Sequence, residues 1–149
     1  MEVDDKIKKL FPYDEEFDNK IVDYVRLMVH CKNNNIAQKK FKEELDLTNQ
    51  ERIMATNYFQ KIIKIRYPYD PDFENKIVDY VRHREEARIF DYKTFTSIEM
   101  QFDIDNEDFI KAVEYQKKYD KPNSFSSLKN GIITLAFFFL GFFLVKLFF

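Results

Sequence analysis

The sequence has few of the residues that build covalent cross-links and metal sites. Its 149 residues include one cysteine, two glycines, four prolines and no tryptophan. Because Cys31 has no second cysteine to pair with, an internal disulfide is excluded and a reducing compartment is indicated. Cys31 follows His30, but a Cys/His metal site needs more ligands than these two. We therefore predict no metal site.

Catalytic motifs are also lacking. The sequence contains no Gly-x-x-x-x-Gly-Lys phosphate loop, no His-Glu-x-x-His pair and no serine elbow flanked by glycines. Adjacent carboxylates occur at Asp14, Glu15 and Glu16, and again at Glu85 and Glu86. Both groups lie in polar stretches with no evident apolar pocket that would shift a pKa. We predict a protein that is not an enzyme, with no cofactor and no small-molecule substrate.

Charge is almost absent from residues 131–149, which read GIITLAFFFLGFFLVKLFF. As a helix, these 19 residues would span roughly 28 Å, close to a hydrocarbon core of about 30 Å. We predict a single membrane-spanning helix, with Lys146 extending its ammonium to the far interface. Five further residues are assigned to this membrane anchor: Ile132, Phe137, Phe139, Phe142 and Phe143.

The expected orientation places the head in the cytoplasm. Nothing follows the span that would need translocation, so a single-pass, tail-anchored protein is expected. Lys121 and Lys129, just before the span, agree with the excess of positive charge on cytoplasmic sides. Residues 120–130, DKPNSFSSLKN, have the composition of a linker.

The head contains two copies of one unit. Residues 11–26, FPYDEEFDNKIVDYVR, match residues 67–82, YPYDPDFENKIVDYVR, at twelve of sixteen positions. Weaker similarity continues between residues 45–60 and 102–117, with the offset increased from 56 to 57. We name residues 5–66 the first copy and residues 67–119 the second copy.

Each copy shows the pattern of three helices. Asp14 and Asp70 are expected near the cap of a first helix, in which Phe17, Ile21, Val25 and Met28 form one apolar face. Residues 31–35 and 84–91 are polar and poorly periodic, which predicts a break there, and His83 is expected in solvent.

A short second helix should end at Leu45 or Phe102, before a turn and a last helix. Thr48 or Asn49, and Asp105 or Asn106, are expected N-caps of the last helix. Its expected apolar face is formed by Ile53, Ala55, Phe59 and Ile62, or by Phe109, Ala112, Val113 and Tyr115. The outline is that of a helix-turn-helix, so the predicted fold is mainly α: two helix-turn-helix or winged-helix-like modules and a C-terminal transmembrane helix.

The second copy resembles a known family. Asp70-Pro71-Asp72-Phe73, the run Lys76–Arg82 and the segment from Thr96 to Ile104 look like the gamma domain of the FtsK/SpoIIIE DNA translocases. The resemblance implies a small winged helix whose recognition helix reads DNA in the major groove. It covers scaffold positions in both copies. The basic reading motif of that family is replaced by Asp105–Lys111 in the second copy, and no motor domain is present.

The resemblance supplies Gln50, Arg52 and Lys111 as candidate DNA contacts, and the positive charge of the first copy adds Lys39, Lys40 and Lys42. The first copy holds thirteen Lys or Arg against ten Asp or Glu, a net charge of +3. Residues 67–122 hold nine against fourteen, a net charge of −5. DNA binding depends on neutralising phosphates, so the first copy favours it and the second opposes it. A solvated face of mixed charge is the alternative interpretation of the first cluster.

Recurrent tyrosines suggest a second function class. Tyr13, Tyr24, Tyr69 and Tyr80 occupy matching positions, and tyrosine is enriched in protein interfaces. The alternative is that they pack within their own modules. We expect a membrane-tethered adaptor that binds a protein. The alternatives are a membrane-tethered DNA-binding protein and an accessory subunit of a membrane complex.

Overall fold

The structure is a computed structural model that describes residues 2–38, 45–91 and 93–120. These residues form helices and contain no strand, so the predicted mainly α fold is confirmed and no β-hairpin wing occurs within them. The predicted membrane span at 131–149 lies outside the described residues, as does the linker beyond Asp120.

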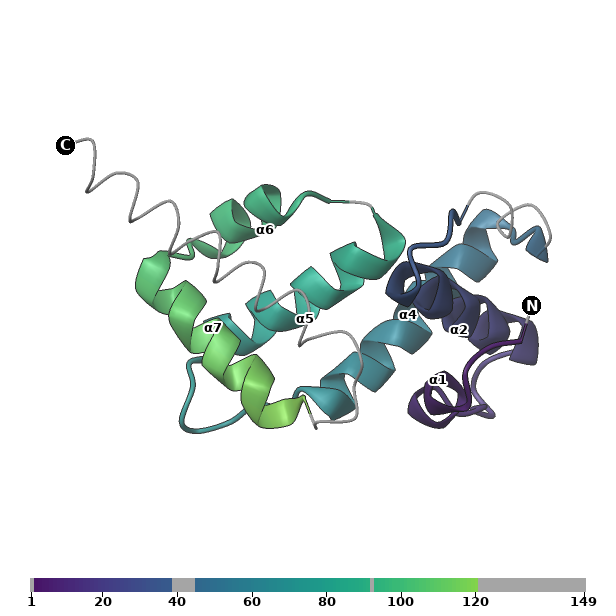
Figure 1. Cartoon of the computed structure of the whole chain (residues 1–149), viewed down its shortest axis with the longest axis horizontal. Helices are drawn as coiled ribbons and strands as arrows, with labels where there is room; N and C mark the ends of the chain where they lie inside the picture. Colours follow the sequence, from purple (N-terminus) through teal and green to yellow (C-terminus); the bar gives the residue numbers. More distant parts are fainter. Residues whose placement is uncertain (1, 39–44, 92, 121–149) are drawn as a thin grey trace. The chain divides into compact units, whose positions relative to one another are not determined.

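Six helices are described, and Figure 1 shows their arrangement. They are α1 (Asp5–Leu10), α2 (Asn19–Asn33), α4 (Asn49–Arg66), α5 (Asn75–Phe90), α6 (Phe95–Phe102) and α7 (Asn106–Tyr119). α4 packs against α2 and α5, while α6 and α7 both pack against α5. The two copies therefore meet in one compact unit, Met1–Tyr119.

The first helix of each copy begins later than predicted. α2 starts after the N-cap Asp18, whose carboxylate accepts from the backbone N–H of Lys20, and α5 starts after Glu74. Asp14 and Asp70 do not cap these helices. Their side chains accept a backbone N–H two residues further on, at 3.0 Å in both copies. An aspartate side chain that accepts this hydrogen bond closes a turn, so the helix begins only after the turn.

The predicted break at residues 84–91 is wrong. α5 continues without interruption to Phe90 and ends at Asp91, which adopts the left-handed conformation with φ 54°. Ala87 and Ile89 are buried in this segment, so tertiary packing holds it helical although its polar sequence shows little periodicity. Packing of this kind commonly overrides local preference.

The structural repeat extends back into the end of α4, before residue 67, which the sequence did not indicate. The short helix α1 was not predicted either, and at an offset of 56 it corresponds to Lys61–Arg66, the last turns of α4. Ile7 and Ile63 are buried at equivalent positions. Both helices end in the same backbone conformation, at Phe11 (φ −119°, ψ 76°) and Tyr67 (φ −117°, ψ 77°). A continuous helix therefore joins the copies in place of a linker.

The ends of the later helices agree with their sequence signals. Thr48 caps α4 in a capping box with Glu51, and Asp105 accepts the backbone N–H of Asp108 at the start of α7. α6 ends at Phe102, as predicted, and Asp103 then adopts a positive φ of 50°. A turn of three residues separates α6 from α7. In the second copy, α6 and α7 are thus joined by a short turn.

One predicted core residue faces solvent. Ile53, placed on the apolar face of the last helix, is 62% exposed, and Tyr58 occupies the core with no exposure. Ile110, the equivalent of Ile53 in α7, is also exposed. The core instead uses the equivalent pairs Ala55/Ala112 and Tyr58/Tyr115, which are buried in both copies.

Candidate functional site

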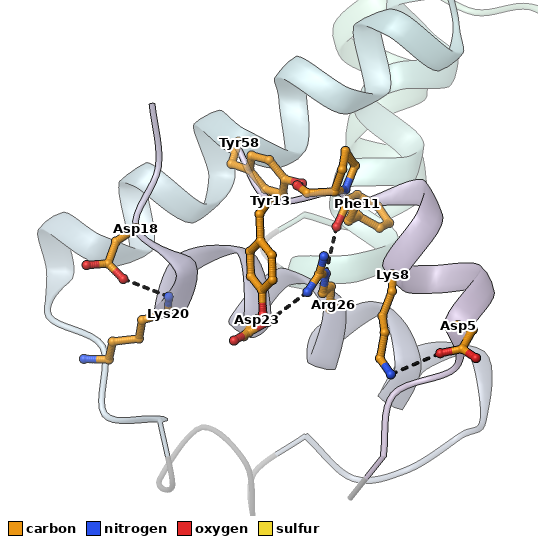
Figure 2. A network of polar contacts seen from close by, with 10 residues as sticks. Asp5, Lys8, Phe11, Tyr13, Asp18, Lys20, Asp23, Arg26 and Tyr58 are labelled. Carbon is orange, nitrogen blue, oxygen red and sulfur yellow. Dashed lines mark hydrogen bonds and ion pairs between the residues drawn. The ribbon is translucent and has the colours of Figure 1, made fainter. Parts of the chain in front are cut away.

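The entry loop of the first copy is held by a buried arginine (Figure 2). Arg26 donates from Nε to the carbonyl of Phe11 at 2.7 Å and pairs with Asp23 at 3.1 Å. The hydroxyl of Tyr13 donates to the same Asp23 carboxylate at 2.9 Å. The Tyr13 ring lies 4.1 Å from the guanidinium carbon, in a cation–π contact. The tyrosine is therefore fixed in place although half of its surface is exposed.

The second copy repeats this arrangement with nearly the same distances. Arg82 donates to the carbonyl of Tyr67 at 2.8 Å and pairs with Asp79 at 3.1 Å. Tyr69 donates to Asp79 at 2.9 Å and lies 4.3 Å from the Arg82 guanidinium carbon. The recurrent Pro-Tyr-Asp motif thus forms the same internal network twice.

A buried tyrosine of the last helix ties that helix to each entry loop. Tyr58 donates its hydroxyl to the carbonyl of Pro12, and Tyr115 donates to the carbonyl of Pro68 at 2.6 Å. Burial raises the pKa of Tyr58 to about 12, so the hydroxyl remains protonated and able to donate at neutral pH. Each ring also makes an edge contact, Phe17 with Tyr58 and Phe73 with Tyr115.

A lysine of the last helix adds a charged contact to the same loop. Lys61 pairs with Asp14 and Glu16, and Lys118 pairs with Asp70 and Asp72. Asp70 also accepts a hydrogen bond of 2.7 Å from the Tyr119 hydroxyl. Hydrogen bonds from Lys118 and Tyr119 lower the pKa of Asp70 to about 2. Asp14, Glu16, Asp70 and Asp72 of the entry loops are therefore paired within the fold.

The four candidate interface tyrosines fall into two classes. Tyr24 and Tyr80 are buried, and Tyr80 donates its hydroxyl to Glu99 at 3.2 Å. Tyr13 and Tyr69 are each 54% exposed and held by the arginine networks. The recurrence of all four is explained by the folding of each copy, and only Tyr13 and Tyr69 offer surface at the entry loops.

The two copies meet through contacts that do not recur. Phe59 of α4 packs edge-on against Phe90 of α5, with ring centroids 5.3 Å apart. Beside them, the Gln60 amide donates to both oxygens of Glu86, at 3.0 and 3.1 Å. Glu86 is buried and lies within the uninterrupted helix α5, where the sequence predicted a break.

This junction is hollowed into an open groove, which we name the inter-copy groove. Its walls are formed by Tyr24, Met28, Arg52, Thr56 and Gln60 of the first copy and by His83, Glu86, Phe90 and Lys93 of the second. His83 is partly buried, with its ring 5.1 Å from that of Phe102, so the prediction of a solvated histidine is wrong. One signal for this site is visible in the sequence: at an offset of 56, Phe90 and Glu86 correspond to Asn34 and His30 of the first copy, so these two positions break the repeat.

Arg52 is an exposed cation of this groove. Its Nε donates to the carbonyl of Leu47 at 3.2 Å, and its charge acts on the hydroxyl of Tyr24. Among the described residues, Arg52 forms no salt bridge with a carboxylate. Its terminal guanidinium nitrogens thus remain available at the groove.

The other DNA-contact candidates are placed differently. Lys39, Lys40 and Lys42 lie outside the described residues. Gln50 is exposed in the first turn of α4. Lys111 pairs with Glu107 at 3.2 Å, which neutralises the cation that the resemblance assigned to α7.

The start of α7 is negative for a structural reason. Asp108 is buried and pairs with Lys76 at 2.6 Å, and hydrogen bonding to that lysine lowers the pKa of Asp108. The carboxylate also accepts from the backbone N–H of Asp105. An acidic first turn suits the positive end of a helix.

No metal-binding cluster occurs among residues 2–38, 45–91 and 93–120. Cys31 is buried, and this burial raises the pKa of its thiol, which disfavours the reactive thiolate. Glu85, the neighbour of Glu86, pairs with Arg88 at 3.1 Å and accepts from Gln116. The adjacent carboxylates thus point to separate partners.

The part of the chain that the structure describes contains no helix long and apolar enough to cross a membrane. The six residues assigned to the membrane span, Ile132, Phe137, Phe139, Phe142, Phe143 and Lys146, all lie outside it. No protein-family model, curated protein or solved structure matches the chain significantly.

Proposed function

We propose that this chain is a membrane-anchored adaptor that is not an enzyme and whose paired helical head binds a protein partner. The observation that carries the proposal is the inter-copy groove. It is an open hollow formed by side chains of both copies, on helices joined by the continuous α4. A surface that combines an apolar centre with a polar rim is typical of protein-binding sites.

The remaining surface supports the same function. The recurrent tyrosines and the charged residues of the entry loops are used to fold each copy. The differences between the copies instead lie at their junction, beside the groove. The apolar run at 131–149 would keep this head at a bilayer, and the head would be cytoplasmic.

The experiment is photo-crosslinking of the full-length chain in its membrane. A benzoylphenylalanine replaces Thr56 in the groove or, as the control, Lys64, an exposed residue of the same helix outside it. We expect a discrete protein adduct from position 56 that is absent from position 64. The adduct protein, once purified, should bind the unmodified chain. Equal labelling from both positions would contradict the proposal.

DNA binding is the second candidate. It is favoured by exposed Gln50 and Arg52 in the first turns of α4, the helix that the translocase resemblance identifies with DNA reading. It is disfavoured by the pairing of Lys111 with Glu107. Fluorescence anisotropy with a labelled random duplex, at low and physiological salt, tests it. Binding that weakens steeply with salt would support a membrane-tethered DNA-binding protein.

A further inference from the structure

We infer that the inter-copy groove binds an acidic segment of a protein partner, with an apolar side chain of that segment seated on the groove floor. This inference rests on the proposed function and adds the chemistry of the ligand. It is drawn from the side chains that line the groove and from the charges that remain accessible there.

The charge accessible in the groove is positive. Arg52 is exposed and forms no salt bridge with the described carboxylates. Lys93, which donates to the side chain of Gln101 at 2.9 Å, adds positive charge at the opposite wall. Among the described residues of the lining, the carboxylate is that of Glu86, which is 6% exposed and accepts from the Gln60 amide nitrogen at both of its oxygens. A carboxylate of the partner would therefore meet Arg52, and a guanidinium binds carboxylates through paired hydrogen bonds.

The floor is apolar. Met28 is buried beneath the groove and Phe90 is partly buried at its side. Methionine adapts its shape to a bound side chain, and an aromatic wall offers a large contact area. A leucine or phenylalanine of the partner fits this floor, with acidic neighbours on the same segment reaching the cations at the rim.

A protein segment fits this groove better than a nucleic acid does. Affinity for DNA comes from neutralising several phosphates, and among the described residues the groove lining offers two cations, Arg52 and Lys93, with His83 beside them. Lys20, near the same end of α4, already pairs with Glu51. A short acidic segment needs only one or two cations, and it also uses the apolar floor.

We expect no equivalent groove in the second copy, because the residues at the positions of Arg52 and Met28 are different there. Phe109 occupies the position of Arg52, and Arg84 occupies that of Met28. The Arg84 guanidinium is covered by the rings of Tyr80, Phe95 and Phe109, at 5.3 to 5.5 Å. The second copy thus uses its cation within the fold, whereas the first copy leaves its cation at the surface.

The test measures peptide binding by the full-length chain in a neutral detergent, by fluorescence anisotropy. Three labelled peptides share a central leucine and phenylalanine and differ in their flanks, which are Asp/Glu, Asn/Gln or Lys/Arg. We expect the acidic peptide to bind about tenfold more tightly than the neutral one. The basic peptide should bind more weakly than both. Equal affinity for the acidic and neutral peptides would overturn the inference.

The variant Arg52→Glu should bind the acidic peptide more weakly, by about tenfold or more, and it should bind the basic peptide more tightly than the parent does. Lys64→Glu makes the same change of charge on the same helix outside the groove, so its affinities should stay within about twofold of the parent. Because Arg52 also bonds Leu47, thermal unfolding checks each variant, and Arg52→Gln replaces Arg52→Glu if the latter is unfolded. Unchanged peptide affinity in a folded Arg52 variant would refute the role of this residue.

A labelled DNA duplex completes the series. Competition between the duplex and the acidic peptide would assign the groove to nucleic acid and overturn the inference. If position 56 crosslinks to a protein but no acidic peptide binds, the adaptor function stands and only the ligand chemistry is wrong. If neither occurs, both proposals are contradicted.

Discussion

The two copies share a scaffold but differ where they contact each other. Both have an arginine bound to the entry loop, a tyrosine hydroxyl on the proline carbonyl and a lysine paired with loop carboxylates. At the junction, however, the first copy presents Phe59 where the second has Gln116, and the second presents Phe90 where the first has Asn34. Each copy thus places an aromatic residue on the face that contacts the other copy. On its opposite face, where a third copy would pack in a longer array, the equivalent position is polar. Terminal units of repeat proteins are polar on their outer faces for the same reason.

The largest change in stability is expected when Phe59, an aromatic residue of the junction, is removed. Phe59 is 1% exposed and contacts Phe11 and Phe90. Phe59→Ala should lower the free energy of unfolding by about 3–5 kcal/mol, because a buried aromatic ring leaves a cavity. Gln116→Ala, the matched control, loses a hydrogen bond to Glu85 and should cost about 1 kcal/mol. Urea unfolding measures both, and equal losses would contradict the assigned asymmetry.

The second prediction tests whether the arginine networks of the two entry loops contribute equally to stability. Arg26→Ala and Arg82→Ala each leave a loop carbonyl without its donor and an aspartate without its cation. Each should lower the free energy of unfolding by about 2 kcal/mol. The two losses should agree within about 0.5 kcal/mol, since Arg26 and Arg82 are similarly exposed and form hydrogen bonds of similar geometry. A much smaller loss in one copy would show that the networks differ in strength.

A smaller effect isolates one hydrogen bond in each copy. Tyr58→Phe and Tyr115→Phe remove the hydroxyls that donate to the carbonyls of Pro12 and Pro68 and leave the rings in place. We expect a loss of about 1 kcal/mol for each change. Chemical denaturation of the single and double variants provides the measurement. Additive losses are expected for separate networks, whereas strong coupling would contradict their independence.

The pH dependence sharpens the comparison of Asp14 with Asp70. The pKa of Asp70 falls to about 2, below the unfolded value of about 4. Its contribution to stability is therefore fully present above pH 4, and it is lost as the pH falls toward 2. The difference in urea midpoint between the parent and Asp70→Asn should shrink over this range.

Asp14→Asn is the matched control for this measurement. The pKa of Asp14 is also lowered, chiefly by the hydrogen bond from Lys61, but Asp70 has the Tyr119 hydroxyl as an additional donor. The difference in urea midpoint between the parent and Asp14→Asn should therefore change less with pH than the difference for Asp70→Asn. A midpoint difference for Asp70→Asn that stays constant between pH 5 and pH 2 would contradict the assigned pairing.

Much of the scaffold could be predicted because it depends on local pattern. The apolar spacing of Ile21 and Val25 and the cap at Thr48 are properties of a few neighbouring residues. Predictions failed where distant residues decide the outcome. α5 remains helical through a polar stretch because the rest of the fold buries Ala87 and Ile89. Tyr58, not Ile53, entered the core because its hydroxyl finds a carbonyl 46 residues away.

By itself, the sequence determined that the chain is mainly helical, that its head is a duplicated unit and that residues 131–149 form an apolar run. Periodicity and repetition are visible within short windows, so no tertiary information was needed. Only the tertiary structure decided that one continuous helix joins the copies and that Arg52 lies exposed in a groove between them. Which cations are paired depends on contacts between residues far apart in the chain, and packing alone establishes those contacts.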